Sequence, residues 1–200
     1  MKYLSRITTL CSLIETSAPV RHVSAMKASG LILLILILSV FTGCKKDPAL
    51  TPAPPVFDID LVHGHLLHAQ SKLPTVKVYV DQQEVTAEIA RQMVEIATGM
   101  MFRTNMPENE AMLFVFNDAE RRSFYMRNCF IPLSAAYISP AGRILEIINM
   151  KPHDETSIPS QSEDVQFVLE VPHGWFNRHN LGVGSMVRTE RGSLQETFFK

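Results

Sequence analysis

Apolar and polar positions alternate from about residue 75 onward, with the period of two that is typical of β-strands. Two short runs share this alternation and are separated by the polar segment 81–83: Val76, Val78 and Val80, then Val85, Ala87 and Ile89. Two alternating runs around a short polar segment predict a β-hairpin.

A helical period replaces the alternation in the next segment. Apolar residues recur there at i, i+3, i+4, i+7 and i+8: Met93, Ile96, Ala97, Met100 and Met101. The spacing predicts an amphipathic helix, which we expect to be the only substantial one. A methionine stripe can form a soft-metal or promiscuous binding surface, but at helical spacing it favours a place in the core.

Further apolar runs are separated by polar loops and turn signals such as residues 140–142. They predict strands over residues 112–116, 122–128, 134–139, 143–150 and 165–171. A short helical turn is expected over residues 172–179, a closing strand over 186–189 and a loose tail over 191–200. Together these elements predict a mainly β (α+β) fold: a small antiparallel barrel-like sheet with one amphipathic helix and a short C-terminal helical turn.

One polar amide interrupts the long apolar run over residues 124–137. If the strand continues through it, Asn128 lies on the same face as Phe124 and Met126. Burying an amide without partners costs roughly 1–3 kcal/mol. Asn128 is therefore expected to be fully hydrogen-bonded, either in a β-bend that it braces or to a ligand.

The first part of the chain has the composition of a leader. Residues 31–41 are almost wholly apolar, a run too short to span a bilayer but of signal-peptide length. The run ends in Thr42-Gly43-Cys44, which resembles a bacterial lipoprotein signal. We expect residues 1–43 to be the leader and signal peptide, with translation starting at Met1 or Met26. Cys44 would then carry a lipid that anchors the protein to the bacterial cell envelope, with its domain in the periplasm or outside the cell.

A proline-rich stretch follows Cys44 and predicts a flexible linker over residues 44–73, before a folded domain over residues 74–190. The linker contains His63, His65 and His68, and a His-x-His pair can bind zinc, copper or nickel. No carboxylate or cysteine at ligand spacing completes the set, so the pattern favours a solvated linker. No metal and no cofactor are expected.

Composition restricts the function further. The chain has 200 residues, of which 46% are hydrophobic, enough for one packed domain. Its formal net charge is −1 and its 19 basic residues form no run, so nucleic acid is not an expected partner. The three cysteines, Cys11, Cys44 and Cys129, are far apart in sequence and form no C-x-x-C pair. We expect a monomer.

Five ordered motifs resemble a known family. They are GMMFR (99–103), MLFVF (112–116), FYMRN (124–128) leading to IPL (131–133), VLEV (168–171) and GWF (174–176). Over residues 78–189 the chain is similar to the bacterial and archaeal family named domain of unknown function 192. The resemblance implies a compact, mainly β domain with one helix, often exported or lipid-anchored. It implies no activity, since the family has no established one.

The chain departs from the family pattern at several positions. Ala111 replaces a usual glycine, Cys129 a usual threonine, and Ser134 and Ser139 replace frequent aspartates. These departures argue against a mechanism that needs a carboxylate at positions 134 or 139. They also argue against Cys129 as a nucleophile with His153 or His173 as its base, because related sequences have threonine there and no basic neighbour is evident.

Two function classes and a structural role remain. The favoured hypothesis is a binding module in which Arg103, Tyr125, Asn128 and Trp175 edge a pocket for a small ligand, a glycan, a peptide or an envelope protein. We expect Glu170, an acid inside a motif strand, to pair with Arg103 and to belong to the same site.

The alternatives are a hydrolase and a structural lipoprotein. The hydrolase would use Glu170 as its acid/base, together with a member of residues 153–155. The structural protein would use its polar residues only to brace the barrel. An open cleft favours binding or catalysis, whereas a filled barrel with Arg103 and Glu170 paired inside favours the structural role.

Overall fold

The structure is a computed structural model that describes residues 58–200. The predicted signal peptide, Cys44 and the first part of the linker lie outside these residues. The described elements follow one another as β1 (Thr75–Val80), β2 (Gln83–Ala90), α1 (Met93–Thr98), β3 (Glu110–Glu120), β4 (Ser123–Phe124), β5 (Leu133–Ile138), β6 (Ile144–Met150), β7 (Ile158–Pro159), β8 (Val165–Pro172), α2 (Trp175–Arg178), β9 (Val187–Thr189), β10 (Gly192–Ser193) and α3 (Leu194–Phe198).

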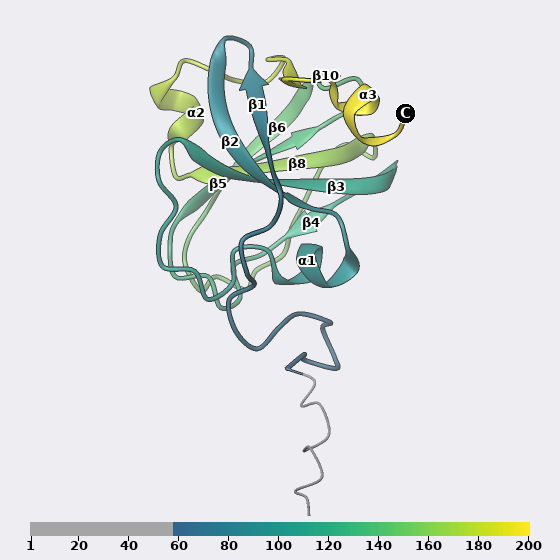
Figure 1. The fold of residues 1–200 in the computed structure, drawn as a ribbon. Helices are drawn as coiled ribbons and strands as arrows, with labels where there is room; N and C mark the ends of the chain where they lie inside the picture. Colours follow the sequence, from purple (N-terminus) through teal and green to yellow (C-terminus); the bar gives the residue numbers. More distant parts are fainter. Residues whose placement is uncertain (1–57) are drawn as a thin grey trace, which may run out of the picture. The chain divides into compact units, whose positions relative to one another are not determined.

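The described strands form an eight-stranded sheet in the order β10-β9-β1-β2-β3-β8-β5-β6, with β4 and β7 as a separate pair (Figure 1). The predicted mainly β class is confirmed. The sheet is mixed rather than antiparallel, because β2 and β3 run parallel. A parallel pair needs a long crossover, and here the segment that contains α1 provides it. The sheet is open and does not close into a barrel.

The predicted hairpin is confirmed by the register of β1 and β2, in which Val78 faces Val85 and Val80 faces Gln83. Asp81 begins the two-residue connection with φ 51°. Hairpin turns of this length commonly need a positive φ, which aspartate tolerates. The Asp81 carboxylate also accepts a hydrogen bond of 2.9 Å from the Met186 N–H, which attaches the turn to the segment before β9.

Both faces of the sheet are covered, so the domain has two apolar clusters. The cluster on the α2 and α3 side includes Leu113, Leu169 and Trp175. The cluster on the α1 side includes Met112 and Val168. Figure 1 shows α1 on one side of β3 and β8, with α2 and α3 on the other. Successive residues along β3, and likewise along β8, therefore belong to different clusters, as strand alternation requires.

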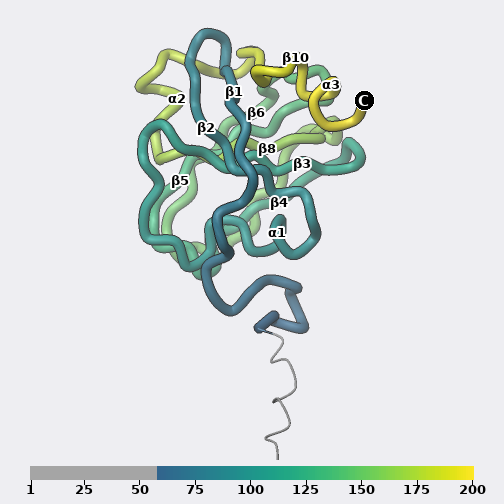
Figure 2. Tube along the Cα trace, viewed as in Figure 1, coloured from purple at the N-terminus to yellow at the C-terminus, as the bar shows by residue number. Residues whose placement is uncertain are grey.

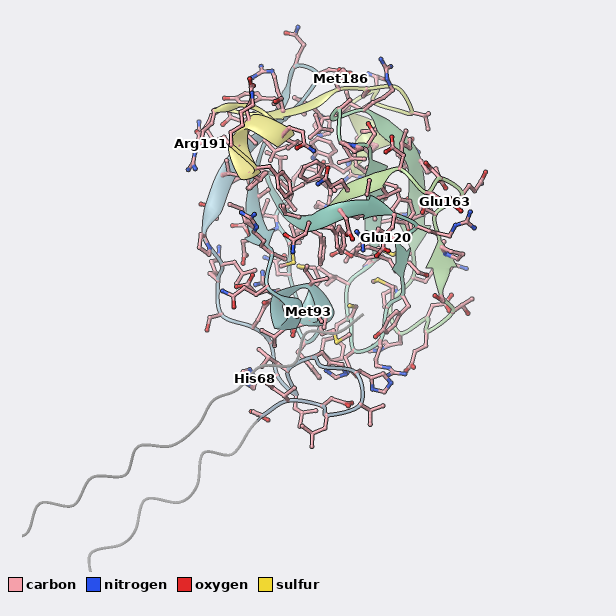
Figure 3. The ribbon with its side chains drawn as sticks, turned by 90° about the vertical axis from the view of Figure 1, so that its right-hand side faces the viewer. His68, Met93, Glu120, Glu163, Met186 and Arg191 are labelled. Carbon is pink, nitrogen blue, oxygen red and sulfur yellow. The ribbon has the colours of Figure 1, made fainter. Side chains whose placement is uncertain are left out.

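Helix α1 is shorter than its methionine stripe predicts. Its Glu95 carboxylate accepts the Gln92 N–H at 2.8 Å, as in a capping box, but the helix ends before Gly99, whose φ is +46°. Met100 lies beyond the helix and is buried. Met93, labelled on α1 in Figure 3, is 88% exposed, so the prediction that it belongs to the apolar face is wrong.

The two ends of the described chain differ from their predictions. The tail over residues 191–200 is not loose: it forms β10 and α3, where Leu194 is buried and Ser193 and Glu196 form a capping box. At the other end, the tube in Figure 2 follows the chain past α1 into β1. There the Gln70 side chain donates to the Gly99 carbonyl at 2.8 Å, so this part of the predicted linker lies against the domain.

Within the part of the chain that the structure describes, no helix has the length and apolar character needed to cross a bilayer.

Candidate functional site

A pocket of about 330 Å³ opens on the α1 side of the sheet. Small-molecule pockets span roughly 300–1,000 Å³, so this one suits a small ligand. Its lining comes from the end of α1 and the turn after it, from β3 and β8, and from the chain around β4: Ile96, Ala97, Thr98, Gly99, Met100, Met101, Phe114, Phe116, Arg121, Arg122, Ser123, Phe124, Tyr125, Cys129 and Glu170.

Aromatic rings form part of the pocket wall. The Phe114 and Phe124 rings meet edge to face at a centroid distance of 5.1 Å. Gly99 lies against Phe114, since a Cβ at position 99 would come within 3.2 Å of the ring. The turn that ends α1 thus brings its backbone close to β3, so residues 99–101 line the pocket together with Phe114 and Phe116.

Glu170 is the one carboxylic acid among the lining residues. Glu170 is 5% exposed, and its Oε2 atom has no hydrogen-bond partner within the described part of the chain. Burial raises the pKa of Glu170 to about 8, and the nearby charge of Arg103 offsets this only in part. At neutral pH the side chain is therefore mostly a protonated acid, which both donates and accepts hydrogen bonds.

The sheet register explains why Glu170 faces the pocket. Glu170 stands opposite Met112 on β3 and opposite Ala135 on β5, and these two residues belong to the α1-side cluster. Met112 in turn stands opposite Glu88 on β2. Glu88 and Glu170 therefore occupy one row of the sheet on the same face, two strands apart with Met112 between them.

The prediction that Arg103 pairs with Glu170 is wrong, because Arg103 pairs with Glu88. Two guanidinium nitrogens donate to the two Glu88 oxygens at 2.6 and 2.8 Å, and the Leu73 N–H donates to Glu88 at 2.8 Å. Burial raises the pKa of Glu88, but these hydrogen bonds lower it more strongly, so the net shift is downward. Arg103 thus braces the buried Glu88 and does not line the pocket.

The prediction that Asn128 lies on a strand is also wrong. The chain leaves β4 after Phe124, and Asn128 occupies a turn with φ 54°, a left-handed conformation that asparagine adopts more readily than most residues. Its backbone carbonyl accepts the Phe102 N–H at 2.7 Å. Asn128 therefore braces a bend through its backbone, and it is not among the pocket residues.

Trp175 lies on the opposite side of the sheet from Glu170. Its side chain belongs to the cluster under α2, it is 1% exposed, and its indole N–H donates to the Glu108 carbonyl at 3.0 Å. Of the predicted site residues, the pocket brings together Tyr125 and Glu170. Arg103, Asn128 and Trp175 lie elsewhere.

Cys129 also lines the pocket, but its thiol is not activated. Burial, with a smaller contribution from the charge of Glu170, raises the pKa of Cys129 to about 12. A thiol of this kind stays protonated at neutral pH and is a poor nucleophile. Residues 153–155, the suggested partners of Glu170, are exposed and absent from the lining, and Glu155 pairs with Arg127 at 2.7 Å.

Arg122 is a pocket residue that the sequence did not single out. Its guanidinium lies 4.0 Å from the centre of the Phe116 ring and pairs with Asp118 at 2.7 Å and with Glu120. Its charge is therefore balanced, and its body packs on an aromatic wall residue. Two consecutive arginines, Arg121 and Arg122, follow an apolar strand in the sequence. This pattern was the signal that could have identified Arg122 as a site residue.

Comparisons with known proteins agree with this fold. The model of the domain of unknown function 192 family, described as Uncharacterized ACR, matches residues 76–189. The crystal structure of a “putative transcription regulator” from Sinorhizobium meliloti 1021 is 26% identical with a TM-score of 0.57, covering 60% of this chain and 98% of its own. A protein of unknown function from Novosphingobium aromaticivorans DSM 12444 is 33% identical with a TM-score of 0.56, covering 60% of this chain and 89% of its own. No curated protein matches the chain.

Proposed function

We propose that this protein, which belongs to the domain of unknown function 192 family, binds a small ligand in its pocket. The ligand is a neutral organic molecule with an apolar body and one polar group. The observation that carries the proposal is the Oε2 atom of Glu170, buried without a partner against an apolar pocket. A buried polar atom without a partner is costly, and a ligand that completes its hydrogen bonds removes that cost.

The protonation state of Glu170 selects the polar group of the ligand. A neutral carboxyl group offers one O–H donor and one carbonyl acceptor, and a primary amide presents the matching acceptor and donor. An amine would first require Glu170 to ionise, which its raised pKa disfavours at neutral pH. The rings of Phe114, Phe116 and Phe124 suit an aromatic or aliphatic ligand body.

The other two roles have less support. A general acid also needs a raised pKa, as Glu170 has, but the lining offers no activated nucleophile or second carboxylate to complete a hydrolase. A purely structural brace would fill the space around its polar groups, whereas Glu170 borders an open pocket. The apolar lining also favours a small organic ligand over a glycan.

A thermal-shift series with a common phenylpropyl body tests the binding function. The probes are 3-phenylpropanamide, 3-phenylpropanoic acid and 3-phenylpropylamine at pH 7. We expect the amide to raise the melting temperature by several degrees at saturation, since a ligand at about 100 times its Kd stabilises by about 2.7 kcal/mol. The acid and the amine should act weakly.

Two variants separate the polar contact from the apolar one. Glu170→Gln keeps a donor and an acceptor and should retain the amide response, whereas Glu170→Leu should abolish it. A response to the amine alone would contradict the neutral carboxyl group. No response to any of the three probes, or an equal response in Glu170→Leu, would contradict the ligand class.

The location of the protein is a second part of the proposal. The apolar run over residues 31–41 and the ending Thr42-Gly43-Cys44 support lipidation of Cys44, with the pocket domain held at the bacterial cell envelope. We expect Cys44→Ala to move the protein from the membrane to the soluble fraction in cell fractionation. Cys11→Ala is the matched control and should leave it membrane-bound. Normal processing and membrane retention of Cys44→Ala would exclude lipidation at this position.

A further inference from the structure

A short loop precedes the family-matched domain and is held in shape by its own backbone. Within residues 58–67, the Asp60 N–H donates to the His65 carbonyl at 2.8 Å and the Leu67 N–H donates to the Asp58 carbonyl at 2.9 Å. The Leu66 N–H donates to the Thr98 hydroxyl of α1 at 3.0 Å. The loop is thus closed on itself and fastened to α1.

Three possible metal ligands converge inside this loop. Asp60, His63 and His65 each offer one ligand atom, and these atoms lie within 4.8 Å of one another. The Asp60 Oδ2 atom is 3.1 Å from His63 Nδ1 and 3.5 Å from His65 Nε2. Ligand atoms around a tetrahedral zinc ion, with bonds of about 2.0–2.2 Å, lie roughly 3.3–3.6 Å apart. The spacing between Asp60 and His65 already falls in this range.

His65 provides the strongest evidence that the cluster is a site. Its side chain is 2% exposed, and its Nδ1 atom lies 2.7 Å from the Leu66 carbonyl oxygen. A carbonyl only accepts, so this contact places the proton on Nδ1 and leaves a lone pair on Nε2. That Nε2 atom is buried, has no hydrogen-bond partner among residues 58–200, and faces the Asp60 carboxylate. A lone pair facing an anion is unfavourable, and a cation between them would satisfy both.

We propose that Asp60, His63 and His65 bind one Zn²⁺ ion, with a solvent molecule as the fourth ligand. Two imidazoles and a carboxylate form a donor set that zinc accepts readily. His65 Nδ1 donates to the Leu66 backbone carbonyl. A metal-bound histidine usually donates its other ring N–H to such a group, which orients the ring. The sequence suggested a His-x-His pair without a third ligand, and the folded loop supplies that ligand as Asp60.

The ion would hold the loop beside the pocket, because the Leu66 N–H donates a hydrogen bond to the Thr98 hydroxyl and Thr98 lines the pocket. The site itself rests on different residues from the ligand proposal. A failure of one therefore leaves the other standing.

Zinc titration of the full-length protein in detergent, after removal of metal with a chelator, tests the site. Competition with a chromophoric chelator should show one equivalent of bound Zn²⁺. Loss of an outer-shell partner typically weakens metal binding 10–100-fold, so loss of a direct ligand in Asp60→Asn or His63→Ala should weaken it by about 100-fold or more. His68→Ala is the matched control and should bind as wild type. His68 lies at the α1 end of the molecule (Figure 3), pairs with Asp58 at 3.2 Å and is outside the cluster.

Asp60→Asn also protects the test from a folding artefact. An asparagine retains the side-chain oxygen that accepts the Val62 and His63 N–H groups at 2.8 and 3.1 Å, so the loop keeps its turn. Unchanged zinc affinity in both Asp60→Asn and His63→Ala would place the ion at other histidines or cysteines and overturn the proposal. A wild-type protein that takes up no equivalent of zinc would overturn it as well.

Discussion

Replacing Arg103 with methionine should lower the free energy of unfolding by about 3–5 kcal/mol, the usual cost of removing one partner of a buried ion pair. Arg103 and Glu88 have side chains that are 15% and 7% exposed, and their contact is bidentate. Without Arg103, the Leu73 N–H is the one hydrogen-bond donor that the described residues still offer to the Glu88 carboxylate. Urea unfolding at pH 7, followed by the fluorescence of Trp175, the one tryptophan of the chain, measures the loss.

A second bidentate pair provides the control for this prediction. Arg178 donates to the two Glu108 oxygens at 3.0 and 2.7 Å, but these side chains are 49% and 52% exposed. Exposed ion pairs contribute roughly 0–1 kcal/mol, so Arg178→Met should cost much less than Arg103→Met. The double variant Arg103→Met with Glu88→Gln should regain part of the loss, because no unpaired charge remains. Equal costs for the two single variants would show that burial does not decide the value of the Arg103 pair.

The elements of the fold were largely predictable because they depend on local pattern. The alternating runs that end at Val80 and begin again at Val85 predicted β1 and β2, and the structure confirms both. The main error in the predicted architecture concerned β2 and β3, which pair in parallel although an antiparallel sheet was predicted. Alternation gives the faces of a strand, but it does not say which strand lies beside it or in which direction.

The wrong prediction of a partner for Arg103 follows from the same limit. Glu88 occupies the polar phase of the hairpin pattern, so a sheet with one solvated face would expose it. In the structure that face of β2 is exposed at Glu84 but covered toward the end of the strand, where Glu88 is 5% exposed and Ala90 is buried. Arg103 therefore finds its partner on a neighbouring element rather than on β8. The sequence singled out Arg103 and Glu170 as partners, but it missed Glu88, which pairs with Arg103 instead.

The candidate pocket was predictable only in part. Tyr125 and Glu170 were recognised because they lie in apolar motifs, but Asn128 and Trp175 were placed by the same argument and do not line the pocket. An apolar motif contributes residues to both faces of the sheet and to the turns after it. Which face holds the cavity depends on the side on which α1 packs, and that is a tertiary property.

Replacing Glu170 with glutamine should stabilise the protein at alkaline pH, the reverse of what a paired Glu170 would give. Burial raises the pKa of the folded-state carboxyl from an ordinary 4.5 to about 8. Between these values the unfolded chain has lost the proton and the folded chain still holds it. The folded state then binds more protons, so the free energy of unfolding falls as the pH rises from about 4.5 to about 8.

The size of the effect follows from the pKa difference. One pH unit corresponds to about 1.36 kcal/mol, so Glu170→Gln should gain about 4–5 kcal/mol over wild type at pH 8.5 and almost nothing at pH 4.5. Urea unfolding at several pH values measures both proteins. Glu163→Gln removes the same charge from a side chain that is 83% exposed, and it should show no such pH-dependent gain. A Glu170→Gln variant that is less stable than wild type at pH 8.5 would mean that an ionised Glu170 has a partner in the folded state. The neutral carboxyl group on which the ligand proposal rests would then be excluded.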